Sequence, residues 1–315
     1  MTHDLGEYRV RPDRKSRLQS LLEDGRFVVT CELGPPQGAD VVPLAQKART
    51  VRDFVDACNL TDCTTAMVRL SSLASSLVVQ SEGIEAIMQL TLRDRNRIGL
   101  QSDLLGASAL GIRNVLCLYG DPPAVGNEKE AKPVYDISTT DFISAIAKMR
   151  DSGELMGGGK LTHSPSFFIG AAATPLREDS SIRIANVAKK VDAGAQFIQT
   201  QPVFDLEVFE EFISDMRSSG LTQRCSFVAG IMPIKSVRMA RHLKEQVHGI
   251  TLPDEIMHRM EASSSPGPEG MKIANDIIDE LRRMRGVSGI HIMTVAWENA
   301  IPEIVTQAGL LPRPA

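Results

Sequence analysis

The sequence predicts an α/β fold of the (β/α)8 TIM-barrel class. Short apolar runs rich in β-branched residues alternate with amphipathic stretches of helical periodicity along the 315-residue chain, a pattern typical of repeated βα units. Eight such runs occur, which is the number of strands in this barrel. Polar residues stand where most of the runs end, and ligands of parallel α/β folds bind at those ends.

The predicted strands, in chain order, are residues 27–33, 57–62, 85–91, 114–120, 167–173, 197–203, 226–232 and 289–295. The helical patterns between them include residues 94–110, 181–193, 206–218 and 271–284, where apolar residues recur at three and four spacing with charges on the other face. The alternative is a doubly wound open sheet of about six strands with a small second domain.

A single domain is expected over residues 1–315, because no linker rich in Pro, Gly and Ser divides the chain. The richest such stretches, residues 151–160 and 263–270, are expected to be long loops. Residues 1–25 are expected to form an N-terminal helical extension. In it, Leu18, Leu21 and Leu22 lie at helical spacing and predict a helix that closes the bottom of the barrel.

Composition favours a protein that binds a small molecule. The net charge is −4, and the basic residues are scattered, which argues against nucleic-acid or anionic-membrane binding. No apolar run approaches the length of a membrane span, and the first four residues, MTHD, lack the pattern of a signal peptide. A cytoplasmic location is therefore expected.

The cysteine and histidine residues give no metal-binding pattern. The five cysteines are odd in number, mostly lie in apolar runs, and form no Cys-x-x-Cys pair, so reduced core thiols are expected. The six histidines are isolated from one another. We expect no bound metal.

One nucleotide-binding motif is incomplete and another is absent. Gly159-Lys160 resembles the end of a phosphate loop, but Glu154 stands where the first Gly belongs and Leu161 where Ser or Thr belongs. A flexible connector is expected there instead. No Gly-x-Gly-x-x-Gly follows a predicted strand, so a nucleotide cofactor would bind in another way.

A ring of polar residues is predicted at the carboxyl ends of the strands, where barrel enzymes place their active sites. Each could instead be a helix N-cap, since Thr and Asp favour strand-to-helix turns. A functional role is favoured for Glu32 and Gln201, because these side chains follow or lie within apolar runs and are costly to bury unsatisfied. The ring consists of Glu32, Thr61, Asp62, Gln89, Thr91, Asp121, Thr174, Gln201 and Thr294.

With these residues in place, the chain resembles the flavin-dependent methylenetetrahydrofolate reductase family from Phe27 to the C-terminus. The most specific stretch is KVDAGA at residues 190–195, which leads to Thr200-Gln201 and Phe204-Asp205. Residues 230–233 (GIMP) and the Gly120-Asp121-x-Pro turn follow the family pattern in the same order.

The resemblance implies site residues position by position. Glu32 matches the general acid, Asp121 reaches both flavin and folate as a second catalytic residue, and Thr61 contacts flavin and nicotinamide. The implied cofactor-binding residues are Thr61, Asp62, Thr64, Gln89, Tyr119, Gly120, Asp121, Asp136, Thr174, Asn186, Lys189, Lys190 and Ala195. The implied substrate-binding residues are Asp121, Gln201 and Thr294.

The chain departs from the family pattern beside the flavin. Gln89, Thr174 and Tyr119 replace His, Tyr and Arg, so the resemblance implies FAD with FMN as the alternative. At the nicotinamide site, Leu243 replaces an aromatic residue that stacks on NADH, and Trp297 replaces an Arg. NAD(P)H is therefore one of two possible electron donors. The other is a partner subunit, because residues 59–62 (NLTD) and 93–97 (RDRNR) resemble the partner-dependent branch.

The implied reaction reduces 5,10-methylenetetrahydrofolate to 5-methyltetrahydrofolate by hydride transfer from a reduced flavin, in one-carbon metabolism and methionine biosynthesis. Ring opening needs a proton at N10, and the apolar neighbours of Glu32 are expected to raise the pKa of its carboxyl group toward neutrality. The alternatives are a flavin-independent, NAD(P)H-dependent folate reductase and a non-catalytic folate-binding scaffold subunit. The sequence leaves a homo-oligomer open.

Four arginines are predicted near the mouth of the barrel, where they could meet a cofactor phosphate or the glutamate tail of folate. For most of them, a solvated surface charge is the favoured interpretation. They are Arg93, Arg95, Arg177 and Arg183.

Overall fold

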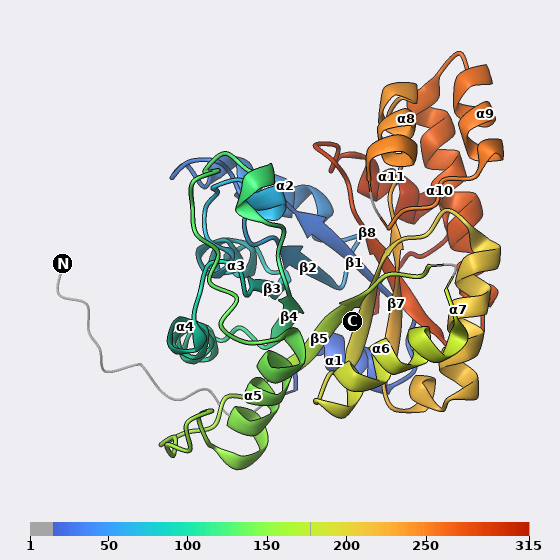
Figure 1. The fold of residues 1–315 in the computed structure, drawn as a ribbon. Coiled ribbons are helices and arrows are strands. Elements are labelled where there is room, and N and C mark those ends of the chain that lie inside the picture. Colours follow the sequence, from blue (N-terminus) through green and yellow to red (C-terminus); the bar gives the residue numbers. More distant parts are fainter. Residues whose placement is uncertain (1–14, 177, 248, 315) are drawn as a thin grey trace.

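The structure is a closed barrel of eight parallel strands in sequential order, seen in a computed structural model that describes residues 15–176, 178–247 and 249–314 (Figure 1). The predicted (β/α)8 barrel is therefore confirmed, and the open six-stranded sheet is wrong. The strands are β1 (Val28–Leu33), β2 (Ala57–Leu60), β3 (Glu85–Thr91), β4 (Asn114–Leu118), β5 (Phe168–Ala173), β6 (Phe197–Pro202), β7 (Ser226–Ile231) and β8 (Val287–Ile292).

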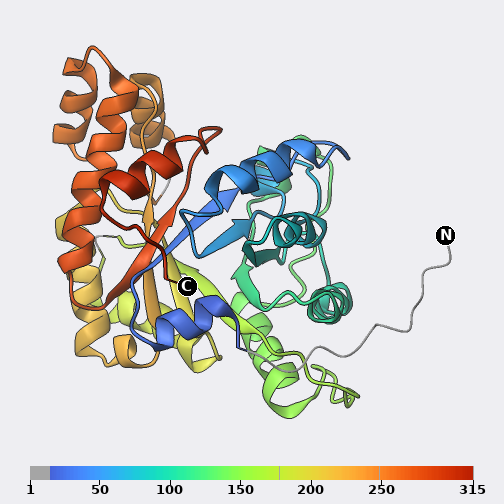
Figure 2. The same ribbon diagram turned by 180° about the vertical axis from the view of Figure 1, so that it is seen from behind.

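Helices surround the barrel and follow each strand, with three in succession, α8 to α10, between β7 and β8 (Figures 1 and 2). They are α1 (Arg17–Glu23), α2 (Val42–Val51), α3 (Ser72–Ser81), α4 (Arg97–Ala109), α5 (Thr139–Ser152), α6 (Ser180–Asp192), α7 (Leu206–Ser218), α8 (Val237–Gln246), α9 (Asp254–Ala262), α10 (Pro266–Arg283) and α11 (Ala300–Gln307). Short 3-10 turns are η2 (Thr64–Ala66), η3 (Pro123–Val125) and η4 (Leu221–Gln223).

One predicted loop is a helix instead. The Gly- and Pro-containing stretch 263–270 was expected to be irregular, but α10 begins at Pro266 and continues through Gly270. Proline is tolerated in the first helical turn because its missing N–H has no partner there in any helix. A Cβ on Gly270 would lie 1.8 Å from the carbonyl oxygen of Ile234, so this glycine allows α10 to approach the loop after β7 closely.

Helix α1 closes the amino-terminal end of the barrel, as the leucine spacing predicts. Its buried Leu18, Leu21 and Leu22 pack in one cluster with residues near the starts of the strands, among them Val28, Ala57, Ile87, Phe168 and Phe197. The larger core cluster lies between the outer faces of the strands and the helices. Apolar side chains therefore fill the amino-terminal end of the barrel, and the polar residues of the predicted ring lie toward the carboxyl end.

Several predicted strands extend past the observed ladders. Strand β2 ends at Leu60, β4 at Leu118 and β8 at Ile292. Thr61 and Thr294 consequently lie in the loops that follow the strands, and Asp121, expected just beyond its strand, lies in the loop after β4. These loops gather at the carboxyl end of the barrel, so the polar residues stay near the same rim.

Candidate active site

Glu32 and Gln89 meet inside the barrel. They come from β1 and β3, which do not pair with each other, so their contact crosses the interior. Gln89 Nε2 donates to Glu32 Oε2 at 3.5 Å. Burial raises the pKa of the Glu32 carboxyl group to about 7, and the hydrogen bond from Gln89 opposes that rise. Glu32 therefore carries the shift toward neutrality that its apolar neighbours predict.

A buried polar pair crosses the barrel from β2 to β6. Asn59 Nδ2 donates to Gln199 Oε1 at 2.8 Å, and Asn59 is fully buried. Glu32 and Asn59 are partners in the β1–β2 register, which places this pair next to the carboxylate. Sequence reasoning missed both residues. Their signal was polar residues two apart in strands, Asn59 with Thr61 and Gln199 with Gln201, since alternate strand residues face the same side.

A second interior pair joins β1 to β8. Thr30 Oγ1 and His291 Nδ1 are 2.9 Å apart, and His291 is fully buried. Burial lowers the pKa of His291 to about 3, so its imidazole is neutral at physiological pH. Its Nε2 atom has no hydrogen-bond partner among the described residues. The sequence did not predict this pair, because a single Thr or His within an apolar run belongs to no recognisable motif.

Thr61 and Asp62, at the end of β2, are buried. The Asp62 carboxylate accepts the Thr91 N–H at 2.8 Å and the Thr91 hydroxyl at 3.0 Å. It also pairs with Arg95, whose Nη1 lies 2.7 Å from Oδ2. Asp62 is thus engaged with neighbouring protein groups, and it organises the loop that carries Thr64.

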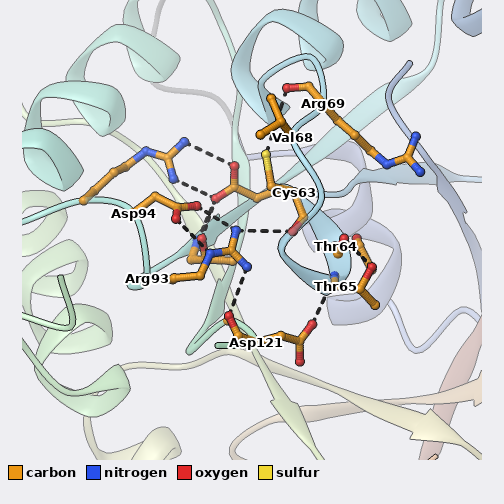
Figure 3. Close-up of polar contacts among 12 residues, drawn as sticks. Cys63, Thr64, Thr65, Val68, Arg69, Arg93, Asp94 and Asp121 are labelled. Carbon is orange, nitrogen blue, oxygen red and sulfur yellow. Dashed lines mark hydrogen bonds and ion pairs between the residues drawn. The ribbon is translucent and has the colours of Figure 1, made fainter. Parts of the chain in front are cut away.

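Asp121 is exposed at the rim, and its carboxylate faces the loop after β2 (Figure 3). Asp121 Oδ2 accepts the backbone N–H of Thr65 at 3.1 Å. The preceding Gly120 has a φ of +91°, a value that suits glycine, and a Cβ there would lie 3.0 Å from Thr91. The Gly-Asp turn therefore directs Asp121 toward Thr64 and Thr65 through a backbone shape that other residues adopt only with strain.

Tyr119 and Asp136 border one cavity of about 490 Å³. The Tyr119 ring stacks on Tyr135 with centroids 4.3 Å apart and an interplanar angle of 5°. Arg97, at the start of α4, forms a bidentate ion pair with Asp136 at 2.7 and 3.1 Å. An aromatic stack beside charged groups can receive a planar ring with polar substituents.

The α6 positions differ in their surroundings. Lys190 donates from Nζ to the Ala172 carbonyl oxygen at 2.6 Å, and burial lowers its pKa. Asn186 and Lys189 are exposed, and Ala195 is buried at the turn before β6. Among the implied α6 residues, Lys189 and Asn186 are thus exposed to an external anion, whereas Lys190 binds the end of β5.

The remaining predicted residues are spread around the rim. Gln201 is exposed, Thr174 follows β5 directly and is half-buried, and the buried Thr294 hydroxyl has no hydrogen-bond partner among the described residues. Leu243 is buried in the core, with 4% of its surface exposed. Lys235 Nζ lies 5.9 Å from the centroid of the Trp297 ring.

The expectation of solvated surface charge is wrong for three of the four arginines. Arg93 is 3% exposed and Arg183 is 7% exposed. Arg93 contacts Asp94, Arg95 bridges Asp62 and Asp103, and Arg183 pairs with Asp215. Arg177 lies outside the described residues. The sequence around a single arginine does not record the carboxylates and carbonyl groups that the fold brings to it from other segments.

Over residues 15–176, 178–247 and 249–314, no cluster of three or more His, Cys, Asp and Glu side chains is arranged to hold a metal ion. Within the same residues, no helix has the length and apolarity needed to cross a membrane.

Comparison with known proteins points to one family. A family model described as methylenetetrahydrofolate reductase matches residues 17–309. A probable methylenetetrahydrofolate reductase (NADPH) of Caenorhabditis elegans is 25% identical over 93% of this chain and 44% of its own length. A probable methylenetetrahydrofolate reductase (NADH) of Oryza sativa is 27% identical over 94% of this chain and 50% of its own. The chain thus spans about half the length of these relatives.

A bacterial relative and a solved structure complete the comparison. The 5,10-methylenetetrahydrofolate reductase of Salmonella typhimurium is 25% identical over 69% of this chain and 68% of its own length. An uncharacterized protein from Clostridium thermocellum, which binds two copies of 5-methyl-5,6,7,8-tetrahydrofolic acid, superimposes with a TM-score of 0.67. It is 14% identical and covers 93% of this chain and 100% of its own, so it shows a shared fold.

Proposed function

The chain belongs to the methylenetetrahydrofolate reductase family, and we propose that it reduces 5,10-methylenetetrahydrofolate to 5-methyltetrahydrofolate, with Glu32 as the general acid. The observation that carries this proposal is the pKa of Glu32, raised to about 7 by burial at the carboxyl end of the barrel. A carboxyl group with this pKa is partly protonated at neutral pH and can still lose its proton to a substrate.

The chemistry requires that proton. The bond between N10 and the methylene carbon breaks as Glu32 protonates N10, which leaves an N5 iminium ion ready to accept a hydride. The neutral carboxyl group delivers its proton from inside the barrel, where Gln89 holds one of its oxygens at 3.5 Å. Glu32 then becomes a carboxylate and recovers a proton before the next turnover.

Asp121 and Gln201 are proposed to bind the pterin. Both side chains are exposed, Asp121 in the loop after β4 and Gln201 next to the last residue of β6. A carboxylate accepts hydrogen bonds from the amino edge of a pterin and stabilises the nearby positive charge of the iminium ion. Thr294, whose hydroxyl has no partner among the described residues, would contribute to the same site from the loop after β8.

The residues around the Tyr119–Tyr135 stack fit a flavin. The rings adjoin a cavity of about 490 Å³, and Asn186 and Lys189 offer exposed polar groups on α6. We propose that Thr61, Thr64, Tyr119, Gly120 and Asp136 contact the cofactor, with Asn186 and Lys189 near its phosphate. When bound, a reduced flavin supplies the hydride. FAD is preferred over FMN because a second ring could rest on the tyrosine stack.

The remaining family positions have supporting roles in this proposal. Gln89 and Thr174 face the cofactor from β3 and the end of β5. Asp62 and Lys190 act indirectly, since Asp62 binds Thr91 and Arg95 and Lys190 binds the Ala172 carbonyl group. Ala195 is buried and packs before β6. The names of the relatives support NADH or NADPH as the electron donor, and a partner subunit stays an alternative donor.

The test uses the purified full-length protein, its absorption spectrum and turnover of 5,10-methylenetetrahydrofolate. A yellow protein that NADH or NADPH bleaches, and that then forms 5-methyltetrahydrofolate, supports the proposal. A yellow protein whose flavin is reduced only in the presence of a second subunit identifies that subunit as the electron donor. Colourless protein that is active with NADH supports direct hydride transfer, and protein inactive with every donor and with dithionite-reduced flavin contradicts the enzymatic function. Cell fractionation tests the predicted cytoplasmic location, and sedimentation tests for a homo-oligomer.

A further inference from the structure

Arg93 connects three loops at the carboxyl end of the barrel (Figure 3). It follows β3, and its side chain donates from Nη1 to the carbonyl oxygen of Asp121 and from Nη2 to that of Cys63, each at 3.2 Å. Its Nε and Nη2 also contact the carboxylate of Asp94 at 2.8 and 2.7 Å. With 3% of its surface exposed, the guanidinium group is enclosed between the loops after β2 and β4.

The loop after β2 has an unusual backbone. Cys63, Thr65 and Ala66 have φ values of 50°, 52° and 54°, in the left-handed region that residues with a Cβ seldom adopt. Each such residue costs of the order of 1–3 kcal/mol and persists only where its surroundings fix it. The loop therefore depends on restraints from outside itself.

Neighbouring loops supply those restraints. Arg93 holds the Cys63 carbonyl oxygen, and the Asp121 carboxylate holds the Thr65 N–H at 3.1 Å. Farther along, Asn127 Oδ1 accepts the N–H of Val68 at 2.9 Å. Two of the strained residues are thus held by Arg93 and by the carboxylate that is proposed to bind substrate.

The loops after β2 and β4 also meet backbone to backbone. A Cβ built on Gly126 would lie 1.9 Å from the carbonyl oxygen of Ala66 and 2.7 Å from its Cβ. No rotation of a side chain relieves an overlap with a carbonyl group, so only glycine permits this approach. The close approach at Gly126 therefore adds to the hydrogen bonds of Arg93, Asp121 and Asn127 in fixing the relation between the two loops.

We propose that Arg93 is a positioning residue, which holds the strained loop 63–66 against the loop of Asp121 and so orients the Asp121 carboxylate toward the substrate. Oδ2 of Asp121 is fixed by the Thr65 N–H, while Oδ1 accepts no hydrogen bond from a described residue and can receive an N–H group of the ligand. This inference rests on the proposed function, because the ligand is the amino edge of a reduced pterin. Arg93 itself does not contact the ligand.

The test measures binding of 5-methyltetrahydrofolate by calorimetry to the full-length protein and to Arg93→Lys. Lysine keeps the charge but has a single nitrogen in place of the planar fork, so it cannot reproduce the four contacts that Arg93 makes through Nε, Nη1 and Nη2. The expected effect is about a 10- to 100-fold rise in Kd, the range of one charge-assisted hydrogen bond lost from the site. Gly126→Ala, which changes no charge and separates the same loops, should raise Kd in the same direction.

Arg150→Lys is the matched control. Arg150 likewise contacts the next residue, Asp151, and a carbonyl group of a neighbouring segment, Phe167, but it lies before β5 at the opposite end of the barrel. The Arg150→Lys variant should lower the melting temperature about as much as Arg93→Lys does and leave the Kd for 5-methyltetrahydrofolate unchanged. A general loss of stability therefore does not imitate the expected result.

A double-mutant cycle with Asp121→Ala separates positioning from plain stability. If Arg93 acts through Asp121, then Arg93→Lys should change Kd by less than about twofold once the carboxylate is gone. Equal effects of Arg93→Lys with and without Asp121, or no effect on Kd in the single variant, would overturn the inference alone. A wild-type protein that fails to bind 5-methyltetrahydrofolate would overturn the proposed folate site together with it.

Discussion

Gln89 Nε2 lies 3.5 Å from Glu32 Oε2 and is the side chain whose hydrogen bond opposes the rise in the Glu32 pKa. The contact spans the barrel interior from β3 to β1. Two effects of opposite sign therefore set the acidity of one carboxyl group. Burial favours the neutral form, and the amide N–H favours the carboxylate.

The activity should fall as pH rises through the pKa of Glu32. Its value is about 7 in the folded protein against an ordinary 4.5, so the acid form is present below pH 7 and is lost above it. We expect kcat/KM for methylenetetrahydrofolate to fall about tenfold per pH unit on the alkaline side. Stopped-flow oxidation of the reduced enzyme by the folate substrate across pH 5.5–9 measures this alkaline fall. A rate independent of pH would contradict the role of Glu32 as the general acid.

Gln89→Leu should move the alkaline fall in activity to higher pH. The substitution removes the hydrogen bond that favours the carboxylate and adds apolar surface, and both changes raise the pKa of Glu32. The pH profile of the same half-reaction is the measurement. Gln223→Leu, at the far end of the barrel before β7, is the control and should leave the profile in place. A shift of the Gln89→Leu profile toward lower pH would be incompatible with this geometry.

Glu32 should also make the protein less stable at alkaline pH. Because the folded state holds its proton up to about pH 7 and the unfolded chain only to 4.5, stability falls as pH rises between these values. Glu32→Gln removes this loss, so the variant should gain melting temperature relative to wild type at pH 8 and little at pH 4. The partly exposed carboxyl group limits the gain to below about 3 kcal/mol. Calorimetry that finds the gain at acid pH instead would contradict the sign.

The Asn59–Gln199 pair should matter more to stability than its single hydrogen bond suggests. Asn59→Leu leaves the buried Gln199 carbonyl oxygen without its donor, and we expect a loss of about 1–3 kcal/mol in the free energy of unfolding. Asn275→Leu is the matched control, because Asn275 makes the same type of bond to Gln307 at 2.8 Å on the outside of the barrel. It should cost less than about 1 kcal/mol. Equal losses in urea unfolding would contradict the interior role of Asn59.

The fold could be predicted because periodicity records burial. Most strands of the barrel lie in largely apolar runs, and Leu18, Leu21 and Leu22 carry the spacing of a helix that packs on one face. Strand ends were less predictable, since Thr61 and Thr294 fall within the predicted strands but lie beyond the hydrogen-bonded ladder. Ladder ends depend on the neighbouring strand, which local sequence does not record.

The site could be predicted only in part. Glu32 stood out because a carboxylate in an apolar run is unusual, whereas the role of Arg93 depends on carbonyl groups of Cys63 and Asp121, which any residue could supply. Two polar pairs form inside the barrel, where strands distant in sequence face each other. They are Asn59 with Gln199 and Thr30 with His291. Such partners emerge only once the barrel closes.

The measurement that tests the central claim most directly is single-turnover reduction of 5,10-methylenetetrahydrofolate by Glu32→Gln, with the reduced protein prepared beforehand. Gln keeps the shape of Glu32 but has no acidic proton to give to N10. We predict that formation of 5-methyltetrahydrofolate is abolished, whereas reduction of the protein by its electron donor and binding of 5-methyltetrahydrofolate are retained. The control Glu303→Gln, at an exposed position of α11, should react as wild type does. A Glu32→Gln protein that forms product at the wild-type rate would contradict the account.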